Sequence, residues 1–294
     1  MTETEQARLV RRIEGLRGRL RAEGVTAATV RAFRSLVHSF YAAHGRDLPW
    51  RATTDPYRVL VSEIMLQQTQ VPRVVVKYAE FLDAFPDVEA LARAPTKRVL
   101  EVWQGMGYNR RAIALQRAAR AVCEEHGGRL PRTVDELVTL PGIGPATAAD
   151  IMAFAYDEPA VVIETNIRAV FIHLFFADGA TVHDHDIVPL VERTMDRTRP
   201  REWYNALMDL GVFIKARHGN PARRSAHHVR QSKFEGSNRQ LRSRILKYLL
   251  QSGPSTPASV ARRLGAASDA VAGNLKKMAT EGLVARDGRR FTVA

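Results

Sequence analysis

Cysteine is nearly absent from this 294-residue sequence, in which Cys123 is the single example. One thiol cannot form an intramolecular disulfide, and it cannot supply the several thiolates that an iron–sulfur cluster needs. Long apolar runs are missing too, since none reaches the roughly twenty residues of a membrane-spanning helix. The polar residues 2–6 do not resemble a signal peptide. We therefore expect a soluble, intracellular protein, with Cys123 as a small buried apolar side chain.

Strand-like alternation of apolar and polar residues is also missing from residues 1–214. Apolar residues there recur at spacings of three and four, which is typical of helices with one buried face. The spacing predicts helices over residues 5–22, 26–43, 57–65, 74–85, 96–103, 110–126, 134–140, 145–156 and 200–215. We expect a mainly α fold, with an N-terminal helix in residues 1–25 that packs on an all-helical body of residues 26–214. The body should have two lobes with a cleft between them.

Acidic residues are scarce in the last third of the chain. Residues 215–233 hold six basic residues and no acidic one, and residues 238–294 hold eleven basic residues against three acidic ones. Residues 1–214 carry 27 of each sign, so the net charge of +13 belongs to the C-terminal segments. Such clustering favours a nucleic-acid partner over a general solubilising charge. We expect residues 215–237 to be a basic linker that contacts DNA through Arg223 and Arg224.

Residues 238–294 have the pattern of a separate module. The sequence predicts helices over 241–250, 256–264 and 268–279, and then a hairpin over 283–293 that turns at Asp287-Gly288. Three helices and a basic two-stranded wing resemble a winged helix, which can bind duplex DNA or a protein. The basic side chains favour DNA. The predicted contacts are Lys276, Lys277, Arg286, Arg289 and Arg290.

A glycine hairpin lies between two predicted helices at Gly142-Ile143-Gly144. Pro141 breaks the first helix, and Pro145 suits the first turn of the second. Backbone N–H groups beside such a helix N-terminus can bind a phosphate, and Thr147 lies in the same turn. The alternative is an ordinary turn between helices. We expect the hairpin to contact DNA phosphates.

Two glutamates stand among apolar residues. Glu63 lies within a predicted helix, where it either faces solvent or is buried with a raised pKa. Glu164 follows the glycine hairpin by about twenty residues, in the apolar run 161–167. Two carboxylates in such settings are candidates for acid–base chemistry.

Histidine patterns give no metal site in the sequence. His183 and His185 alternate with Asp184 and Asp186 in a predicted loop, without a cysteine or the i, i+4 spacing of helical ligands. His218, His227 and His228 could ligate zinc, but their neighbours are basic and repel a cation. We expect no metal ion.

Six stretches resemble the helix-hairpin-helix DNA glycosylases, the superfamily that includes endonuclease III and the MutY-like adenine DNA glycosylases. They are Leu48-Pro49-Trp50-Arg51, Asp55-Pro56-Tyr57, residues 61–71 with their Ser62-Glu63 and Gln67-Gln68 pairs, Gly105-Met106-Gly107-Tyr108-Asn109, residues 140–148, and Met208-Asp209-Leu210-Gly211. The resemblance extends over roughly residues 30–214, in the family's order. The stretch 62–70 is similar to the adenine-specific branch.

The resemblance implies a function for several side chains. Glu63 would be the general acid toward the base, and Glu164 would face the sugar at a position where the family normally has Asp. Gln67 or Gln68 would fill the gap left by a flipped base. Met106, Tyr108 and Asn109 would line the cleft, with Arg110 and Arg111 near phosphates.

Three departures from the family pattern refine the expected function. The four cluster-binding cysteines are missing after residue 214, so we expect no iron–sulfur cluster and no other cofactor. Ala146 stands where bifunctional relatives have a Schiff-base lysine, which predicts a monofunctional glycosylase. Residues 238–294 stand where adenine glycosylases usually have a Nudix-like domain. The preference for the base opposite the excised base is therefore left open.

We therefore expect base excision of a damaged or mispaired base, adenine first, from double-stranded DNA. The alternatives are a mismatch uracil or thymine glycosylase and a non-catalytic DNA-binding relative. We expect a monomer in the cytoplasm, associated with the nucleoid if the source is bacterial, and no membrane partner.

Overall fold

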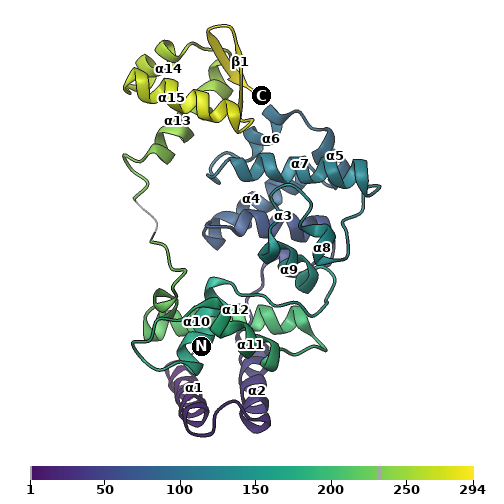
Figure 1. Cartoon of the computed structure of the whole chain (residues 1–294), viewed down its shortest axis with the longest axis vertical. Helices are drawn as coiled ribbons and strands as arrows, with labels where there is room; N and C mark the ends of the chain where they lie inside the picture. The colour runs from purple at the N-terminus through teal and green to yellow at the C-terminus, as the bar shows by residue number, and fades with distance from the viewer. Residues whose placement is uncertain (1, 231–232) are drawn as a thin grey trace. The chain divides into compact units, whose positions relative to one another are not determined.

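The computed structural model describes residues 2–230 and 233–294 (Figure 1). Met1 of the predicted N-terminal segment and Gln231 and Ser232 of the predicted linker lie outside the described residues. The chain forms two compact units, and each is built from two separate stretches. Unit 1 comprises residues 1–54 and 148–230, and unit 2 comprises residues 55–147 and 231–294. No helix of the described residues is both long enough and apolar enough to span a membrane.

Unit 1 is all-helical. Its elements are α1 (Glu3–Glu23), α2 (Ala27–His44), the 3-10 turn η1 (Pro49–Arg51), α10 (Thr165–Phe175), α11 (Asp184–Thr194), α12 (Pro200–His218) and η2 (Pro221–Arg224). The α1 helix begins at the capping box of Thr2 and Glu5 and buries the predicted stripe of Leu9, Ile13, Leu16 and Leu20. Thr26 caps α2, as the sequence predicts.

The core of unit 1 forms around α10, whose residues pack most extensively on α12 (Figure 1). Phe33 of α2 meets Phe171 and Trp203 edge to face, with ring centroids 5.8 and 5.5 Å apart. Gly211 lets α12 approach α10 closely, because a Cβ at this position would lie 2.2 Å from the carbonyl oxygen of Asn166. Glycine is therefore a packing requirement at this crossing.

A buried ion pair joins η1 and the segment before it to α12. Asp209 exposes 2 % of its side chain and accepts two hydrogen bonds from Arg51, at 2.8 and 2.9 Å, and one from the Arg46 backbone at 2.8 Å. Burial alone would raise the pKa of Asp209, but these donors hold it below its usual value. The pair brings together two of the family-like stretches, residues 48–51 and 208–211.

Unit 2 contains a second helical body. Its elements are α3 (Pro56–Leu66), α4 (Val71–Ala84), α5 (Val88–Arg93), α6 (Thr96–Val102), α7 (Arg110–Glu125) and α8 (Val134–Leu137), and α9 (Pro145–Phe154) runs across the boundary into unit 1. Phe81 and Trp103 are fully buried in its core, with ring centroids 5.8 Å apart.

The C-terminal part of unit 2 has the predicted order of three helices and a hairpin. These are α13 (Asn238–Ser252), α14 (Pro257–Leu264), α15 (Ser268–Thr280), β1 (Val284–Asp287) and β2 (Arg290–Val293). The strands are antiparallel, with Val284 opposite Val293. Ser255 pairs with Phe291 and ties the start of α14 to the hairpin. The assignment of this module as a winged helix stays a prediction.

Four local expectations were wrong. The first hairpin helix ends at Leu137 and not at residue 140, because Thr139 and Leu140 form a turn that is closed by backbone bonds to Glu136 and Leu137. The sequence analysis missed α5 because it has only six residues. The expected loop at 183–186 is the start of α11, which a capping box of His183 and Asp186 initiates. Cys123 is half-buried rather than fully buried.

Gly211→Ala should destabilise the protein by about 1–3 kcal/mol or more, because overpacking at a backbone contact cannot be relieved by a rotamer change. Urea unfolding followed by circular dichroism measures the change. Gly18→Ala, in α1 with nothing within 4 Å of its ideal Cβ, is the matched control and should stabilise by roughly 0.5–1 kcal/mol. Equal stability of the two variants would contradict the close approach.

Candidate active site

The glycine hairpin connects α8 to α9 in unit 2. Gly142 has φ 81°, and a Cβ there would lie 2.6 Å from the Cβ of Ala114 on α7, so both the backbone angle and the space require glycine. Gly144 has nothing within 4 Å of its ideal Cβ. Pro145 is the first residue of α9, as predicted. Gly142, Gly144 and Ala146 are exposed, so the backbone of this helix start is open on its outer side.

Thr147 connects the hairpin to the stretch that carries the predicted wedge residues. Its side chain is buried, and its Oγ1 accepts a hydrogen bond of 3.3 Å from Nε2 of Gln67. Contact of Thr147 with DNA stays a prediction. Within unit 2 its observed partner is Gln67.

Two predicted site residues have backbone angles that L-amino acids rarely adopt. Gln68 has φ 54° and Tyr108 has φ 45°, and Asp157 is the other non-glycine residue with positive φ among those described. Such a conformation costs on the order of 1–3 kcal/mol and persists where the surroundings impose it. Gln68 is exposed, and 36 % of Tyr108 is exposed. No sequence pattern indicates these backbone angles in advance.

Arg111 contacts the residue before each of these two positions. Its Nη1 donates to the carbonyl oxygens of Ile64, Met65 and Gln67, and its Nη2 donates to Thr69 Oγ1 and to the carbonyl oxygens of Met106 and Gly107. Its guanidinium also lies 5.5 Å from the centroid of the Tyr108 ring. One side chain thus connects the stretches 64–69 and 106–108. Burial lowers the pKa of Arg111 to about 10, so it stays charged at neutral pH.

This geometry makes Arg111 a positioning residue for the candidate site. The sequence analysis expected Arg111 to lie near phosphates, and that contact remains a prediction. Arg110 is the exposed member of the pair, with 71 % of its side chain accessible and Glu281 3.9 Å away. Met106 is buried, with 2 % exposed, so in this conformation its side chain packs inside the body. Asn109 is half-buried directly before α7.

Tyr108 has a partner that sequence reasoning missed. Nη1 of Arg239, from α13, donates to the Tyr108 hydroxyl at 2.9 Å, and the guanidinium lies 5.7 Å from the ring centroid. A lone arginine at the start of a helix carries no sequence signal for such a contact. The C-terminal module therefore reaches a predicted pocket residue within unit 2.

Glu63 lies on α3 and is half-buried, while its neighbours Ser62 and Ile64 are buried. Burial raises the pKa of Tyr78 to about 12, and the charges of Asp55 and Glu63 add to that rise, while the charge of Arg58 opposes it. Glu63 therefore lies in a partly desolvated position on the helix that precedes the wedge residues. Its role as an acid stays a prediction.

Glu164 lies in unit 1 as the N-cap of α10, where it accepts a hydrogen bond of 3.4 Å from the backbone of Thr165. Burial raises the pKa of its carboxyl, and the Thr165 hydrogen bond and the charge of Arg168 offset only part of that rise. Arg168 itself donates to both oxygens of Asp184 at 2.7 Å. The hydrogen bond and the charge of Arg168 therefore compensate only part of the cost of burying ionised Glu164.

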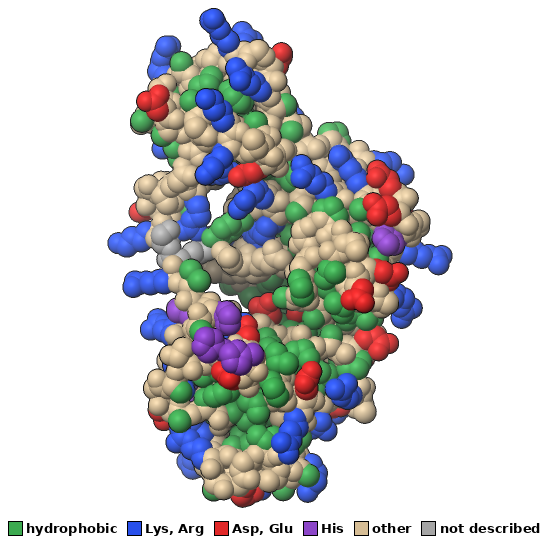
Figure 2. Space-filling model, viewed as in Figure 1, with side chains coloured by type: hydrophobic (Ala, Val, Ile, Leu, Met, Phe, Trp, Pro, Cys, Tyr) green, Lys and Arg blue, Asp and Glu red, His purple; other side chains and the backbone are tan. Residues whose placement is uncertain are grey.

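The basic residues predicted to contact DNA differ in their exposure and in their hydrogen bonds. Arg223, Lys276, Lys277, Arg289 and Arg290 are exposed. Arg224 instead donates to the backbone oxygens of Ala177 and Ala180. Arg286 is exposed, and its Nε donates to the carbonyl oxygen of Gly288 at 2.9 Å across the hairpin turn. Figure 2 shows Lys and Arg side chains spread over the C-terminal module on this face.

The comparisons with known proteins agree with this fold and these stretches. Residues 61–187 match the HhH-GPD superfamily of base excision DNA repair proteins. An adenine DNA glycosylase of Mycolicibacterium smegmatis is 35 % identical over 245 residues, which cover 76 % of this chain and 82 % of that protein. The chain belongs to the HhH-GPD superfamily of base excision DNA repair proteins, and the predicted mainly α glycosylase fold is confirmed.

Other relatives are longer than this chain. The adenine DNA glycosylase of Mus musculus is 39 % identical over 199 residues, which cover 64 % of this chain but only 39 % of that protein. Among solved structures, a thermostable thymine-DNA glycosylase aligns with a TM-score of 0.56 and 28 % identity, over 62 % of this chain and 85 % of its own. An endonuclease III–DNA complex aligns with a TM-score of 0.51 and 17 % identity, over 64 % and 86 %, which shows the fold alone.

Arg111→Lys should destabilise the protein by about 2–4 kcal/mol, because one ammonium group cannot serve acceptors in two separate loops and leaves buried carbonyl groups without a donor. Urea unfolding measures the loss. The matched control is Arg110→Lys at the exposed neighbouring position, which should stay within about 0.5 kcal/mol of the wild type. If both variants unfold at the same urea concentration, Arg111 does not hold the loops.

Glu164→Gln should raise the melting temperature at pH 7 by a few degrees, since about 1 kcal/mol shifts Tm by roughly 2–4 °C in proteins of this size. The pKa of Glu164 is raised by burial, so its ionised form opposes folding above that pKa and its protonated form does not. The gain should therefore vanish as the pH falls below the ordinary glutamate pKa.

Thermal scans at several pH values test this dependence. Glu158→Gln is the control, because Glu158 is exposed and its replacement should leave Tm unchanged at every pH. A gain from Glu164→Gln that persists unchanged in acid would show that charge burial is not its cause.

Proposed function

We propose that this protein is a monofunctional DNA glycosylase that removes a damaged or mispaired base, adenine first, from double-stranded DNA. The observation that carries the proposal is the extent of the match to the mycobacterial adenine DNA glycosylases. The Mycobacterium tuberculosis H37Rv protein is 32 % identical over 231 residues, which cover 72 % of this chain and 76 % of that protein. Such a match extends well beyond the glycine hairpin.

Hydrolysis of an N-glycosidic bond requires the base to leave the stack and to receive a proton. We assign the proton transfer to Glu63, which is half-buried on α3. Gln67 and Gln68 follow directly after that helix, and Arg111 fixes their backbone. A side chain held in a strained conformation is pre-organised to enter a gap in the duplex, so this stretch is the proposed wedge.

The departing base leaves a sugar with developing positive charge, which a carboxylate stabilises. We assign this role to Glu164. Its side chain is longer than the expected Asp by one C–C bond of about 1.5 Å. Because burial raises the pKa of Glu164, a larger fraction is protonated in mild acid, and base release should fall there. The family's Asp would give a shorter reach from the same helix N-cap.

The hairpin and the basic surface supply the contacts to the DNA backbone in this proposal. The bare helix start at Gly142 and Gly144 suits a phosphate. Exposed Arg223, Lys276 and Lys277 supply positive charge on the linker and on α15. We propose residues 238–294 as a winged-helix module that binds DNA, with Arg289 and Arg290 on its wing.

The proposed product is an intact strand with an abasic site. Schiff-base chemistry needs an amine, and Ala146 offers none at the exposed start of α9. We propose that no iron–sulfur cluster takes part, because Cys123 alone cannot hold one.

A second candidate activity is removal of thymine or uracil from mismatches. The thermostable thymine-DNA glycosylase, at 28 % identity over 62 % of this chain, favours it. A panel of duplexes that each carry one lesion or mismatch separates the two substrates. Strand cleavage only after alkali treatment shows base release without lyase activity.

Glu63→Gln should lower single-turnover base release by ~10² to 10⁴, because glutamine keeps the size and hydrogen bonding of glutamate but has no transferable proton. Binding to the same duplex should persist, as measured by fluorescence anisotropy. Glu125→Gln, at an exposed position on α7, is the control and should keep full activity. Full activity in Glu63→Gln would remove the assignment. Tight binding with no base release by the wild type would instead identify a non-catalytic relative.

A further inference from the structure

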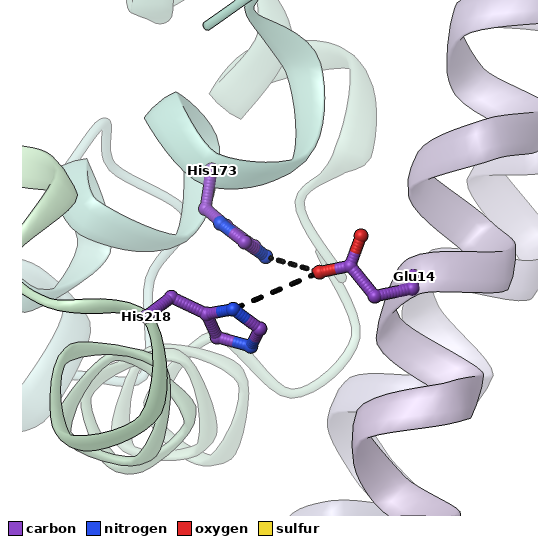
Figure 3. A group of neighbouring side chains, drawn as sticks. All are labelled: Glu14, His173 and His218. Atoms are coloured by element: carbon purple, nitrogen blue, oxygen red, sulfur yellow. Dashed lines mark hydrogen bonds and ion pairs between the residues drawn. The ribbon is translucent and has the colours of Figure 1, made fainter.

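Three side chains from distant parts of the sequence converge in unit 1. Glu14 lies on α1, His173 lies on α10, and His218 is the last residue of α12. Both imidazole rings point toward the carboxylate of Glu14 (Figure 3). Oε1 of Glu14 lies 3.2 Å from Nε2 of His173 and 3.8 Å from Nδ1 of His218. The three donor atoms lie within 4.8 Å of one another.

The donor spacing is close to that of a metal site. Ligand bonds of about 2.0–2.2 Å to a tetrahedral Zn²⁺ place neighbouring donors roughly 3.3 Å apart. The Glu14–His173 pair already has this separation. The remaining adjustment falls on His218, at the end of its helix, with 23 % of its side chain exposed.

The chemistry of the three donors also suits a divalent transition metal. Two imidazoles and one carboxylate are a ligand set that Zn²⁺ takes with a water in the fourth position. His173 exposes 6 % of its side chain and Glu14 exposes 42 %. The cluster is therefore buried at His173 and open to solvent at Glu14.

Arg17 is the cationic side chain next to this cluster, and acidic side chains compensate its charge. Nη1 of Arg17 lies 3.6 Å from Oε2 of Glu14, the oxygen that faces away from the histidines. Arg17 is also paired with Asp178, which accepts a second hydrogen bond from Arg21. The basic residues that argue against zinc in the sequence include Lys215 and Arg217 beside His218. Lys215 donates to Asn166 Oδ1 at 3.1 Å, and Arg217 is exposed. His227 and His228 are not part of this cluster.

We propose that Glu14, His173 and His218 bind one divalent transition-metal ion of the Zn²⁺ class, which fastens α1 to α10 and α12. The expectation of a metal-free protein came from the spacing of His183 and His185 and from the basic neighbours of His218, His227 and His228. The structure adds a carboxylate 159 residues before His173 in the sequence. A ligand set drawn from three helices would stabilise the packing of the N-terminal helix without taking part in the proposed chemistry on DNA.

The test uses the full chain without a histidine tag, after treatment with a chelator and removal of the chelator. Titration with Zn²⁺ should show one tight site per chain and a concentration-dependent rise in Tm. Co²⁺ should give the visible absorption bands of a site with nitrogen and oxygen ligands. Mg²⁺, which prefers octahedral oxygen ligands, should not raise Tm.

Glu14→Gln and His218→Gln should each weaken Zn²⁺ binding at least about tenfold and abolish the Co²⁺ bands, because each removes one of the three protein ligands. His227→Gln and His228→Gln are the matched controls, since both are exposed histidines outside the cluster, and they should bind Zn²⁺ as the wild type does. All four positions lie outside the buried core, so the variants should fold.

Equal Zn²⁺ affinity in the wild type and in His218→Gln would overturn the proposal. So would a Tm rise with Mg²⁺ as large as that with Zn²⁺. Base release by the metal-free and metal-loaded protein is measured alongside. Failure of the glycosylase assay does not affect this test, because its readout is metal affinity.

Discussion

The arrangement of the candidate site depends on a single guanidinium group. Arg111 donates to carbonyl oxygens at Gln67 and Met106, and so connects two loops of unit 2. Residues in the left-handed region follow or lie near both acceptors, at Gln68 and Tyr108. Strained loops relax unless something rigid opposes them, and here the opposing element is α7 with its buried charge. The hydrogen bonds of Arg111 described above are therefore all made within the protein.

The two carboxylates assigned to catalysis are placed by different physical means. Glu63 is positioned by the apolar faces of α3, while Glu164 is positioned by its role as the N-cap of α10. The cap hydrogen bond holds one carboxylate oxygen of Glu164 at the backbone N–H of Thr165.

Much of the fold could be predicted from the sequence because apolar spacing and caps are local signals. The stripe of α1, the Thr26 cap of α2 and the Asp287-Gly288 turn all behave as those signals indicate. Less of the candidate site could be predicted from the sequence. Motif residues pointed to Glu63 and Gln68, but the roles of Arg111 and Arg239 depend on contacts across 42 to 131 residues. The Glu14–His173–His218 cluster could not be predicted for the same reason, because Glu14 and His173 are 159 residues apart in the sequence.

The interleaving of the two units constrains how the chain can fold as it is synthesised. Unit 1 needs residues 1–54 and 148–230, so α1 and α2 emerge from the ribosome long before α10 and α12 exist to cover them. The apolar stripe of α1 must wait through the synthesis of about half the chain, which exposes it to aggregation or to chaperones. A helical protein usually folds fast through local contacts, but here sequence separation makes the last docking step slow.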